Sequence, residues 1–299
     1  MLPIPGPGAA IARARPRASA ARDRWMALAF VAPALLIAGF VVVGGIGMSV
    51  IQSVGLLPLV GEAEFSLDAY VANGDELLTG LALSLGIATA STVLSCVIGL
   101  AAAIIITQGR TTGRVVAALS ALTIPIPHLV GAASIGLLIA DSGLIPRLFG
   151  IPSAVWPDLV GGPWWVAVVL EYTWKESAFV ALVVAGVLAT RVARYDETAA
   201  LLGASRARRL RHVVIPLATP AVIVSAIIIF VYTLGSYEVA WLLGRPYPEP
   251  LPVLAFRLFT SITLTSRPEA AAVAVVTTLV SLLVVAIGMA MLRRTPLWK

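Results

Sequence analysis

The sequence predicts an all-α integral membrane protein with six transmembrane helices. Of its 299 residues, 59% are hydrophobic and only 12% are charged, whereas soluble domains carry about 25% charged residues. The mean hydropathy is +0.97, and the apolar runs lack the polar faces that helices of a large soluble protein need. Six runs reach the length of about 20 residues that crosses a bilayer. They fall near residues 26–50, 81–107, 115–140, 164–190, 219–243 and 269–292.

The N-terminal region predicts a tail followed by an uncleaved first span. Residues 1–25 are rich in Pro, Ala and Arg, which is typical of a disordered basic segment. The run at 26–50 is longer than the apolar region of a signal peptide, and no small-residue cleavage site follows it. We therefore expect a disordered tail over 1–25 and a transmembrane domain over 26–299.

Prolines mark the later spans. Span three (115–140) contains Pro125 and Pro127, and prolines inside a span free backbone carbonyls that protein or water must satisfy. They indicate either a broken helix beside a pathway or a kink that serves packing. Thr219 before Pro220 predicts the N-cap and first residue of span five. Pro268 marks the start of span six in the same way.

The distribution of charge predicts that both termini are cytoplasmic, because basic residues favour that side of a membrane. In this orientation the inside holds Arg13, Arg15, Arg17, Arg22, Arg24, Arg110, Arg114, Arg191, Arg194, Arg206, Arg208, Arg209, Arg211, Arg293, Arg294 and Lys299. The outside holds only Arg147, Arg245, Arg257 and Arg267. The first outside loop is purely acidic in its charges, with Glu62, Glu64, Asp68, Asp75 and Glu76. The net charge of +6 therefore reflects membrane orientation, and we expect no nucleic-acid partner.

Several kinds of chemistry are excluded by missing motifs. A phosphate-binding loop needs Gly-x-x-x-x-Gly-Lys-Ser/Thr, and neither Lys175 nor Lys299 follows a glycine. Cys96 is the only cysteine, and no HExxH or Gly-x-Ser-x-Gly sequence is present. His128 and His212 are far apart, and each is expected to be structural or solvated rather than a ligand. We expect no catalytic site, no metal and no cofactor on this chain, so any ATP would be bound by a partner.

Charged residues inside the spans are the candidates for a translocation path. Span four carries Glu171, Lys175 and Glu176 near its middle, and ionisable residues in a membrane usually face a cavity. Glu171 and Lys175 are four residues apart and are expected to pair on one helix face. The pair could line the path or lock the helix to a neighbour, and both alternatives stay open. Tyr237 and Glu238, near the outer end of span five, are further candidates for the path.

The hydrophilic segment at 191–218 is the strongest functional signal. Glu197 to Gly203 is expected to form a short helix with acidic residues at its N-terminus, where the helix dipole favours them. Gly203 can adopt a positive φ and turn the chain, and a second, basic helix is expected from Ser205 to Val214. Pro216 and Pro220 are expected to stop this second helix. An ordinary basic loop would explain the arginines but not this order of acidic residues, glycine and prolines.

In this segment the chain resembles the membrane subunits of binding-protein-dependent ABC importers. That family carries Glu-Ala-Ala, a glycine and then Ile-x-Leu-Pro at fixed spacing. The residues in register are Glu197, Ala199, Gly203, Val213, Ile215 and Pro216. The departures are Thr198 in place of alanine and Leu202 where aspartate is common. In span four, Trp174, Lys175 and Phe179 also resemble the family, although Ala178 replaces a frequent proline. The resemblance covers roughly residues 80–299.

The resemblance implies a type I importer core of six helices in a bacterial inner membrane. The loop at 195–216 would be a coupling helix that docks on an ATP-binding cassette subunit, present in two copies. The docking residues that it implies are Glu197, Ala199, Gly203, Ala204, Arg206, Arg208, Arg209, Ile215 and Pro216. The implied partners also include a second permease subunit, an extracytoplasmic solute-binding protein and membrane lipid. The outer loop before span six looks like the polyamine, ferric-iron and thiamine branch.

Two other classes of function compete with this interpretation. A secondary transporter would use an ion gradient, with Glu171, Lys175 and Glu176 as its relay, but the inverted repeat common in that class is not evident. An intramembrane enzyme would need a nucleophile or a set of metal ligands inside a span, and the sequence provides neither. The sequence therefore favours the permease of an ATP-driven importer that takes up a small molecule.

Overall fold

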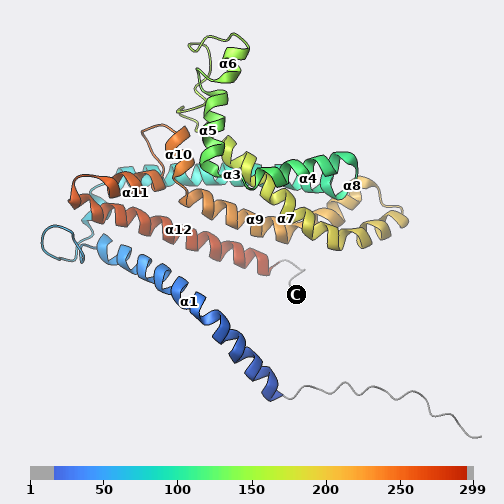
Figure 1. Ribbon diagram of the computed structural model, residues 1–299, viewed down its shortest axis with the longest axis horizontal. Helices are drawn as coiled ribbons and strands as arrows, with labels where there is room; N and C mark the ends of the chain where they lie inside the picture. The colour runs from blue at the N-terminus through green and yellow to red at the C-terminus, as the bar shows by residue number, and fades with distance from the viewer. Residues whose placement is uncertain (1–16, 295–299) are drawn as a thin grey trace, which may run out of the picture. The chain divides into compact units, whose positions relative to one another are not determined.

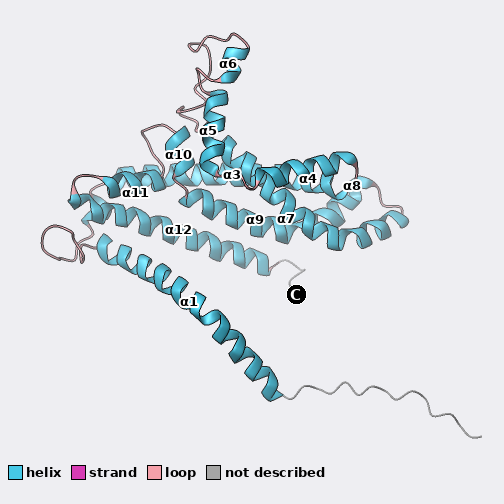
Figure 2. Ribbon diagram, viewed as in Figure 1, coloured by secondary structure: helices cyan, strands magenta, loops and turns pink. Residues whose placement is uncertain are grey.

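The structure is a computed structural model that describes residues 17–294. Every regular element in that range is a helix, as Figure 2 shows. Six helical segments of the described range are long and apolar enough to cross a membrane. They are Arg24–Ser53, Gly74–Thr107, His128–Leu148, Val166–Ala189, Arg206–Gly235 and Leu264–Arg293. The structure confirms the all-α class and the expected number of membrane-crossing helices, although the third and fifth segments are shifted from the expected 115–140 and 219–243.

The chain divides into two units after Met48, and the described part of the first unit is the portion of helix α1 (Arg17–Ser53) that precedes Ser49. Its interior contains Pro33. Residues 17–25 belong to this helix, so the expectation of disorder up to residue 25 is corrected for this stretch. The reason is that alanine and arginine, which dominate it, are both strong helix formers. Residues 1–16 of the expected tail lie outside the described residues.

The second unit contains the remaining elements. Its α-helices are α2 (Asp68–Val71), α3 (Gly74–Thr107), α4 (Thr111–Thr123), α5 (His128–Ile139), α6 (Leu144–Leu148), α7 (Val166–Leu201), α8 (Arg206–Arg209), α9 (Ile215–Gly235), α10 (Glu238–Leu243), α11 (Leu251–Thr260) and α12 (Arg267–Arg293). A π-helical turn (Leu210–Val214) joins α8 to α9, and a short 3₁₀ turn (Leu264–Ser266) precedes α12.

Helices α3, α7 and α9 form the centre of the bundle, and α12 packs against α9 (Figure 1). Small residues let these helices approach closely, as is usual where membrane helices associate. At Gly99 of α3, a Cβ atom would lie only 2.7 Å from the carbonyl oxygen of Ser177 on α7. One core cluster fills this contact region. Its buried members are Ala103, Val180, Val184, Ala185, Leu188, Ala218, Ala221 and Ile229.

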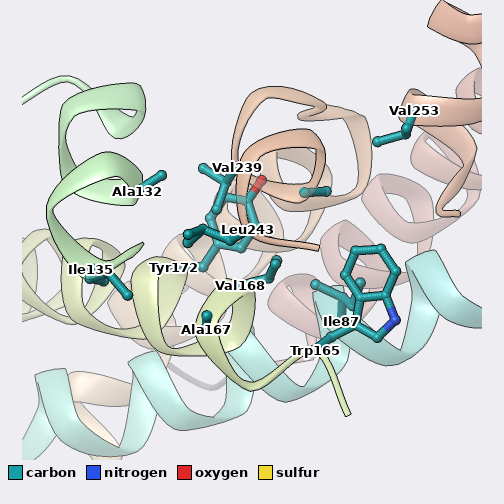
Figure 3. Packing of buried hydrophobic residues seen from close by; sticks show 11 residues of the cluster. Ile87, Ala132, Ile135, Trp165, Ala167, Val168, Tyr172, Val239, Leu243 and Val253 are labelled. Atoms are coloured by element: carbon teal, nitrogen blue, oxygen red, sulfur yellow. The ribbon is translucent and has the colours of Figure 1, made fainter. Parts of the chain in front are cut away.

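Span three is interrupted between α4 and α5. Helix α4 ends at Thr123, and α5 begins at His128 after the two prolines. Figure 1 shows α5 and α6 projecting to one side of the long helices. A second core cluster holds the base of α5 against α7 and α10, with Tyr172, Val239 and Leu243 close together (Figure 3). The prolines therefore coincide with a real break in the helix.

Span five differs from the expected pattern at both ends. Its helix begins before Thr219, whose Oγ1 donates to the carbonyl oxygen of Ile215 (2.8 Å), so Thr219 is no N-cap. Pro216 and Pro220 likewise do not stop the helix. The π-helical turn explains the first proline, because there the Ile215 N–H bonds to the carbonyl of Leu210, one residue farther back than in an α-helix. Helix α12 does begin beside Pro268, as expected.

Candidate functional site

Four charged residues of α5 and α7 form one group inside the bundle, here called the charged cluster: His128, Glu171, Lys175 and Glu176. Nδ1 of His128 lies 3.0 Å from Oε1 of Glu171, and Nε2 lies 3.4 Å from Oε1 of Glu176. The carboxylate of Glu171 is fully buried, while the side chains of His128 and Glu176 are 17% and 12% exposed. The cluster thus reaches from the core of the bundle to its surface.

The geometry around His128 suits a protonated ring. Carboxylates only accept hydrogen bonds, and only the imidazolium form presents an N–H from both ring nitrogens. With a carboxylate at each nitrogen, the imidazolium form satisfies both contacts. Together with the ammonium of Lys175, the cluster then carries two positive and two negative charges. Mutual neutralisation of this kind lowers the cost of charged groups in a membrane.

Lys175 does not pair with Glu171, which corrects the expectation from their spacing. Among the described residues its Nζ donates to the backbone carbonyls of Thr123 (2.9 Å), Ile124 (3.4 Å) and Ile126. These carbonyls lie at the break of span three, where the regular α-helical hydrogen bonds end. The i,i+4 spacing places both side chains on one face of α7. Lys175 nevertheless bonds to the backbone carbonyls, and Glu171 bonds to His128.

His128 was expected to be structural or solvated rather than a ligand, and the structure gives it carboxylate and aromatic neighbours that the sequence did not identify. Its ring lies 5.0 Å from that of Tyr232 and 5.9 Å from that of Tyr172, measured between ring centroids. Gly131 permits this approach, because a Cβ at that position would lie 3.0 Å from Oε1 of Glu171. A lone histidine directly after a proline inside an apolar span was the signal that could have identified it.

Tyr237 and Glu238 lie at the start of α10, and Tyr237 packs against the core cluster that contains Tyr172. Glu238 is exposed, and the ring of Tyr237 stacks on Phe256 with 4.8 Å between centroids. In the described part of the chain, no hydrogen bond or ion pair joins either residue to the charged cluster. Of the candidates for the path, the structure therefore groups Glu171, Lys175 and Glu176 and leaves Tyr237 and Glu238 separate.

The basic segment (residues 191–218) is a turn between two long helices. The expected short helix at Glu197–Gly203 is instead the last part of α7, which runs unbroken to Leu201. Gly203 has φ +79°, as expected for the turn, and the N–H of Ala204 bonds to the carbonyl of Ala199 (3.0 Å). Ser205 then caps α8 by accepting from the N–H of Arg208. The side chain of Glu197 lies outside the described part of the structure.

This turn exposes both apolar and basic side chains. Leu201 and Leu202 are 89% and 83% exposed, and the sequence did not single them out. The other expected docking residues differ in exposure: Arg206, Arg208, Ile215 and Pro216 are exposed, whereas Ala199, Ala204 and Arg209 are half-buried. An apolar tip with basic flanks is the composition of a protein contact surface rather than of a solvated loop.

Six membrane helices, a charged cluster inside the bundle and an exposed helical turn define the membrane-spanning subunit of a transporter. The chain belongs to the family of binding-protein-dependent transport system inner membrane components, whose model matches residues 95–295. It is thus the permease subunit of an ABC importer, and a secondary transporter is not favoured. Membership of this family confirms the resemblance seen in the sequence.

Two curated relatives and two solved structures illustrate the similarity. The chain is 26% identical to the sulfate transport system permease protein CysT of Salmonella typhimurium over 213 residues, 71% of this chain and 76% of that protein. It is 30% identical to the molybdenum transport system permease protein ModB of Mycobacterium bovis over 165 residues, 53% of this chain and 59% of that protein.

The fold is that of known importer permeases. A chain of a bacterial ABC transporter that imports the polysaccharide alginate superimposes with a TM-score of 0.73 at 18% identity, covering 94% of this chain and 100% of that chain. A chain of the methionine transporter MetNI in an inward-facing conformation gives a TM-score of 0.58 at 18% identity, covering 75% of this chain and 98% of that chain.

Proposed function

We propose that the turn at the end of α7 is the coupling element that docks on a separate ATP-binding subunit. The observation that carries this proposal is the exposure of Leu201 and Leu202 at the tip of a helix that enters the bundle without a break. Apolar tips of this kind fill pockets at the centre of an interface, and flanking arginines contribute at its edge. ATP is bound and hydrolysed by that partner, and this chain contributes no catalytic residue.

The orientation and the assembly follow from the same proposal. The basic segment and both termini lie in the cytoplasm of a bacterium, and the chain spans its inner membrane. Two ATP-binding subunits, a second permease subunit and an external solute-binding protein complete the importer. The MetNI structures and an alginate transporter solved with a periplasmic protein support partners of these types.

The translocation path passes the charged cluster. Glu176 is the member of α7 that combines a carboxylate with partial exposure, and Tyr237 and Glu238 extend the path toward the outer side. Glu171 and Lys175 do not line the path themselves. Both are buried and bonded within the protein, so they hold the residues that line it in place. The names of the matched relatives, sulfate and molybdenum permeases, favour an inorganic oxyanion as substrate, although the carboxylates of Glu176 and Glu238 would by their charge suit a cation. The names do not favour the polyamine, ferric-iron and thiamine branch expected from the outer loop.

The docking proposal is tested by capture of the partner. The full chain is tagged and purified from native membranes in mild detergent, and co-purified proteins are identified by mass spectrometry. We expect a Walker-motif ATPase with the wild type and its loss from Leu201→Ser/Leu202→Ser. The matched control, Leu279→Ser/Leu282→Ser, changes two exposed leucines of α12 and should retain the ATPase. Equal recovery from both double variants would contradict docking at the turn.

The substrate is tested separately on the external partner. A solute-binding protein recovered in the same purification is titrated with sulfate, molybdate, spermidine, ferric citrate and thiamine by calorimetry. Binding of sulfate or molybdate would support the oxyanion proposal. Binding of spermidine, ferric citrate or thiamine instead would overturn it while leaving the docking proposal intact.

A further inference from the structure

The break in span three leaves backbone carbonyls without helical partners. Pro127 has no N–H, so the carbonyl of Thr123, four residues earlier, loses its usual α-helical donor and accepts instead from the N–H of Ile126, three residues on, at 3.2 Å. The carbonyls of Ile124 and Ile126 fall within the break itself, between the end of α4 and the start of α5. Inside a membrane such groups must be satisfied by the protein or by trapped water.

Lys175 of α7 supplies the missing donors. An ammonium group has three N–H donors and no acceptor, and its three hydrogen bonds go to these three carbonyls. Its positive charge also lies at the C-terminal end of α4, where the helix dipole favours a cation. One side chain therefore binds three carbonyls of the break and joins it to α7.

We propose that Lys175 is a positioning residue that holds span three bent against α7. Helix α5 begins at His128, directly after the break, so the geometry of the break determines where this ring lies. By fixing the break, Lys175 places His128 between Glu171 and Glu176. The further consequence, that α5 follows α7 during transport, rests on the proposed function.

Two observations favour positioning over a role in the path or in charge balance. The side chain of Lys175 is only 6% exposed, so it does not meet a passing solute. The carboxylate of Glu171 already has His128 as its partner through both oxygens, at 3.0 and 3.2 Å. All hydrogen-bonding capacity of the lysine is used on the break.

The test measures the distance between α4 and α5, and hence the bend of span three, by pulsed electron paramagnetic resonance. Spin labels replace Leu122 on α4 and Leu137 on α5, both exposed, in a Cys96→Ser background. The full chain is purified from native membranes with its partner subunits, and labelled chain is diluted with unlabelled chain. Lys175→Met alone could change the distance by removing the donor of the break or by removing a charge near Glu171. Three double variants separate these causes: Lys175→Met/Pro127→Ala, Lys175→Met/Pro125→Ala and Lys175→Met/Glu171→Gln.

We expect one narrow distance in the wild type and loss of that single distance in Lys175→Met. Pro127→Ala restores an N–H for the carbonyl of Thr123 and lets α4 continue, so this double variant should regain a single but longer distance. Pro125→Ala offers its N–H to Ala121, which Lys175 does not contact, and should restore nothing. Recovery of the original distance by Glu171→Gln, or an unchanged distance in Lys175→Met, would overturn the proposal. The distance between the two labels does not depend on docking at the turn near Gly203. A negative result in this experiment therefore leaves the coupling proposal untouched, and the reverse also holds.

Discussion

Nδ1 of His128 lies 3.0 Å from Oε1 of Glu171, although 43 residues separate them in the sequence. The contact joins α5 to α7 in the membrane part of the bundle. Because the glutamate side chain has no exposure, it relies on protein partners rather than on water, and His128 is the partner that lies near both of its oxygens. The pair is therefore more sensitive to loss of a partner than an exposed ion pair would be.

Replacing His128 by alanine should strongly destabilise the protein. Removal of one partner from a buried ion pair leaves the other charge uncompensated, at a cost of about 3–5 kcal/mol. We expect a large drop in the melting temperature in detergent. Glu176→Gln is the control, since Glu176 is partly exposed and more distant from the ring, and it should lower the melting temperature much less. Equal drops would show that burial of Glu171 has no special role.

Gly99→Ala should loosen the contact between α3 and α7. The added methyl group would meet the carbonyl of Ser177 and the side chain of Val180, and overpacking of this kind costs about 1–3 kcal/mol. Gly86→Ala on the same helix is the matched control, because no atom lies within 4 Å of its added Cβ. Thermal unfolding of both variants measures the difference. A lower melting temperature for Gly86→Ala than for Gly99→Ala would contradict the close packing.

Arg257 of α11 bridges two carboxylates that differ in burial. It binds Glu76 of α3 at 2.8 Å and also Glu249, whose side chains are 37% and 7% exposed. Arg257→Ala strands the buried Glu249 and should destabilise the protein clearly. Glu76→Ala removes only an exposed partner, and such pairs contribute about 0.2–1 kcal/mol. The order of the two melting temperatures checks this, and the reverse order would argue against Glu249 as the dominant partner.

Gly203→Pro should abolish coupling between ATP hydrolysis and uptake while the protein still inserts into the membrane. The glycine has φ +79°, whereas proline is held near −65°, so the turn cannot keep its shape. Gly203→Asn is the control, because asparagine tolerates the left-handed region. Uptake and ATPase activity in native vesicles measure coupling. Normal uptake by Gly203→Pro would remove the turn from the coupling pathway.

Composition and charge pattern were sufficient to predict the membrane class and the number of membrane-crossing helices. Mean hydropathy is summed over many residues, so a single polar residue in a span does not change the prediction of a membrane helix. The partners of individual side chains were less predictable. The spacing of Glu171 and Lys175 suggested a pair on one helix, and nothing local showed that the carbonyls near Pro127 would compete for the lysine.

Span five illustrates the same limit for helix ends. Thr219 and Pro220 have the composition of a helix start, yet the helix continues through them. Helix α9 packs against α3, α7 and α12, and these contacts outweigh a local preference for a cap. A π-helical turn directly precedes Pro216, with the Ile215 N–H bonded to the carbonyl of Leu210, and no local residue preference indicates such a turn.

The unbroken length of α7 has a mechanical consequence. Its 36 residues correspond to about 54 Å of helix, with no loop along the way to absorb a rotation. A tilt of about 10° around one end would displace the other by roughly 9 Å at this length. Small angular changes at the turn near Gly203 are thus amplified into displacements larger than the diameter of a sulfate ion at the opposite end of the helix.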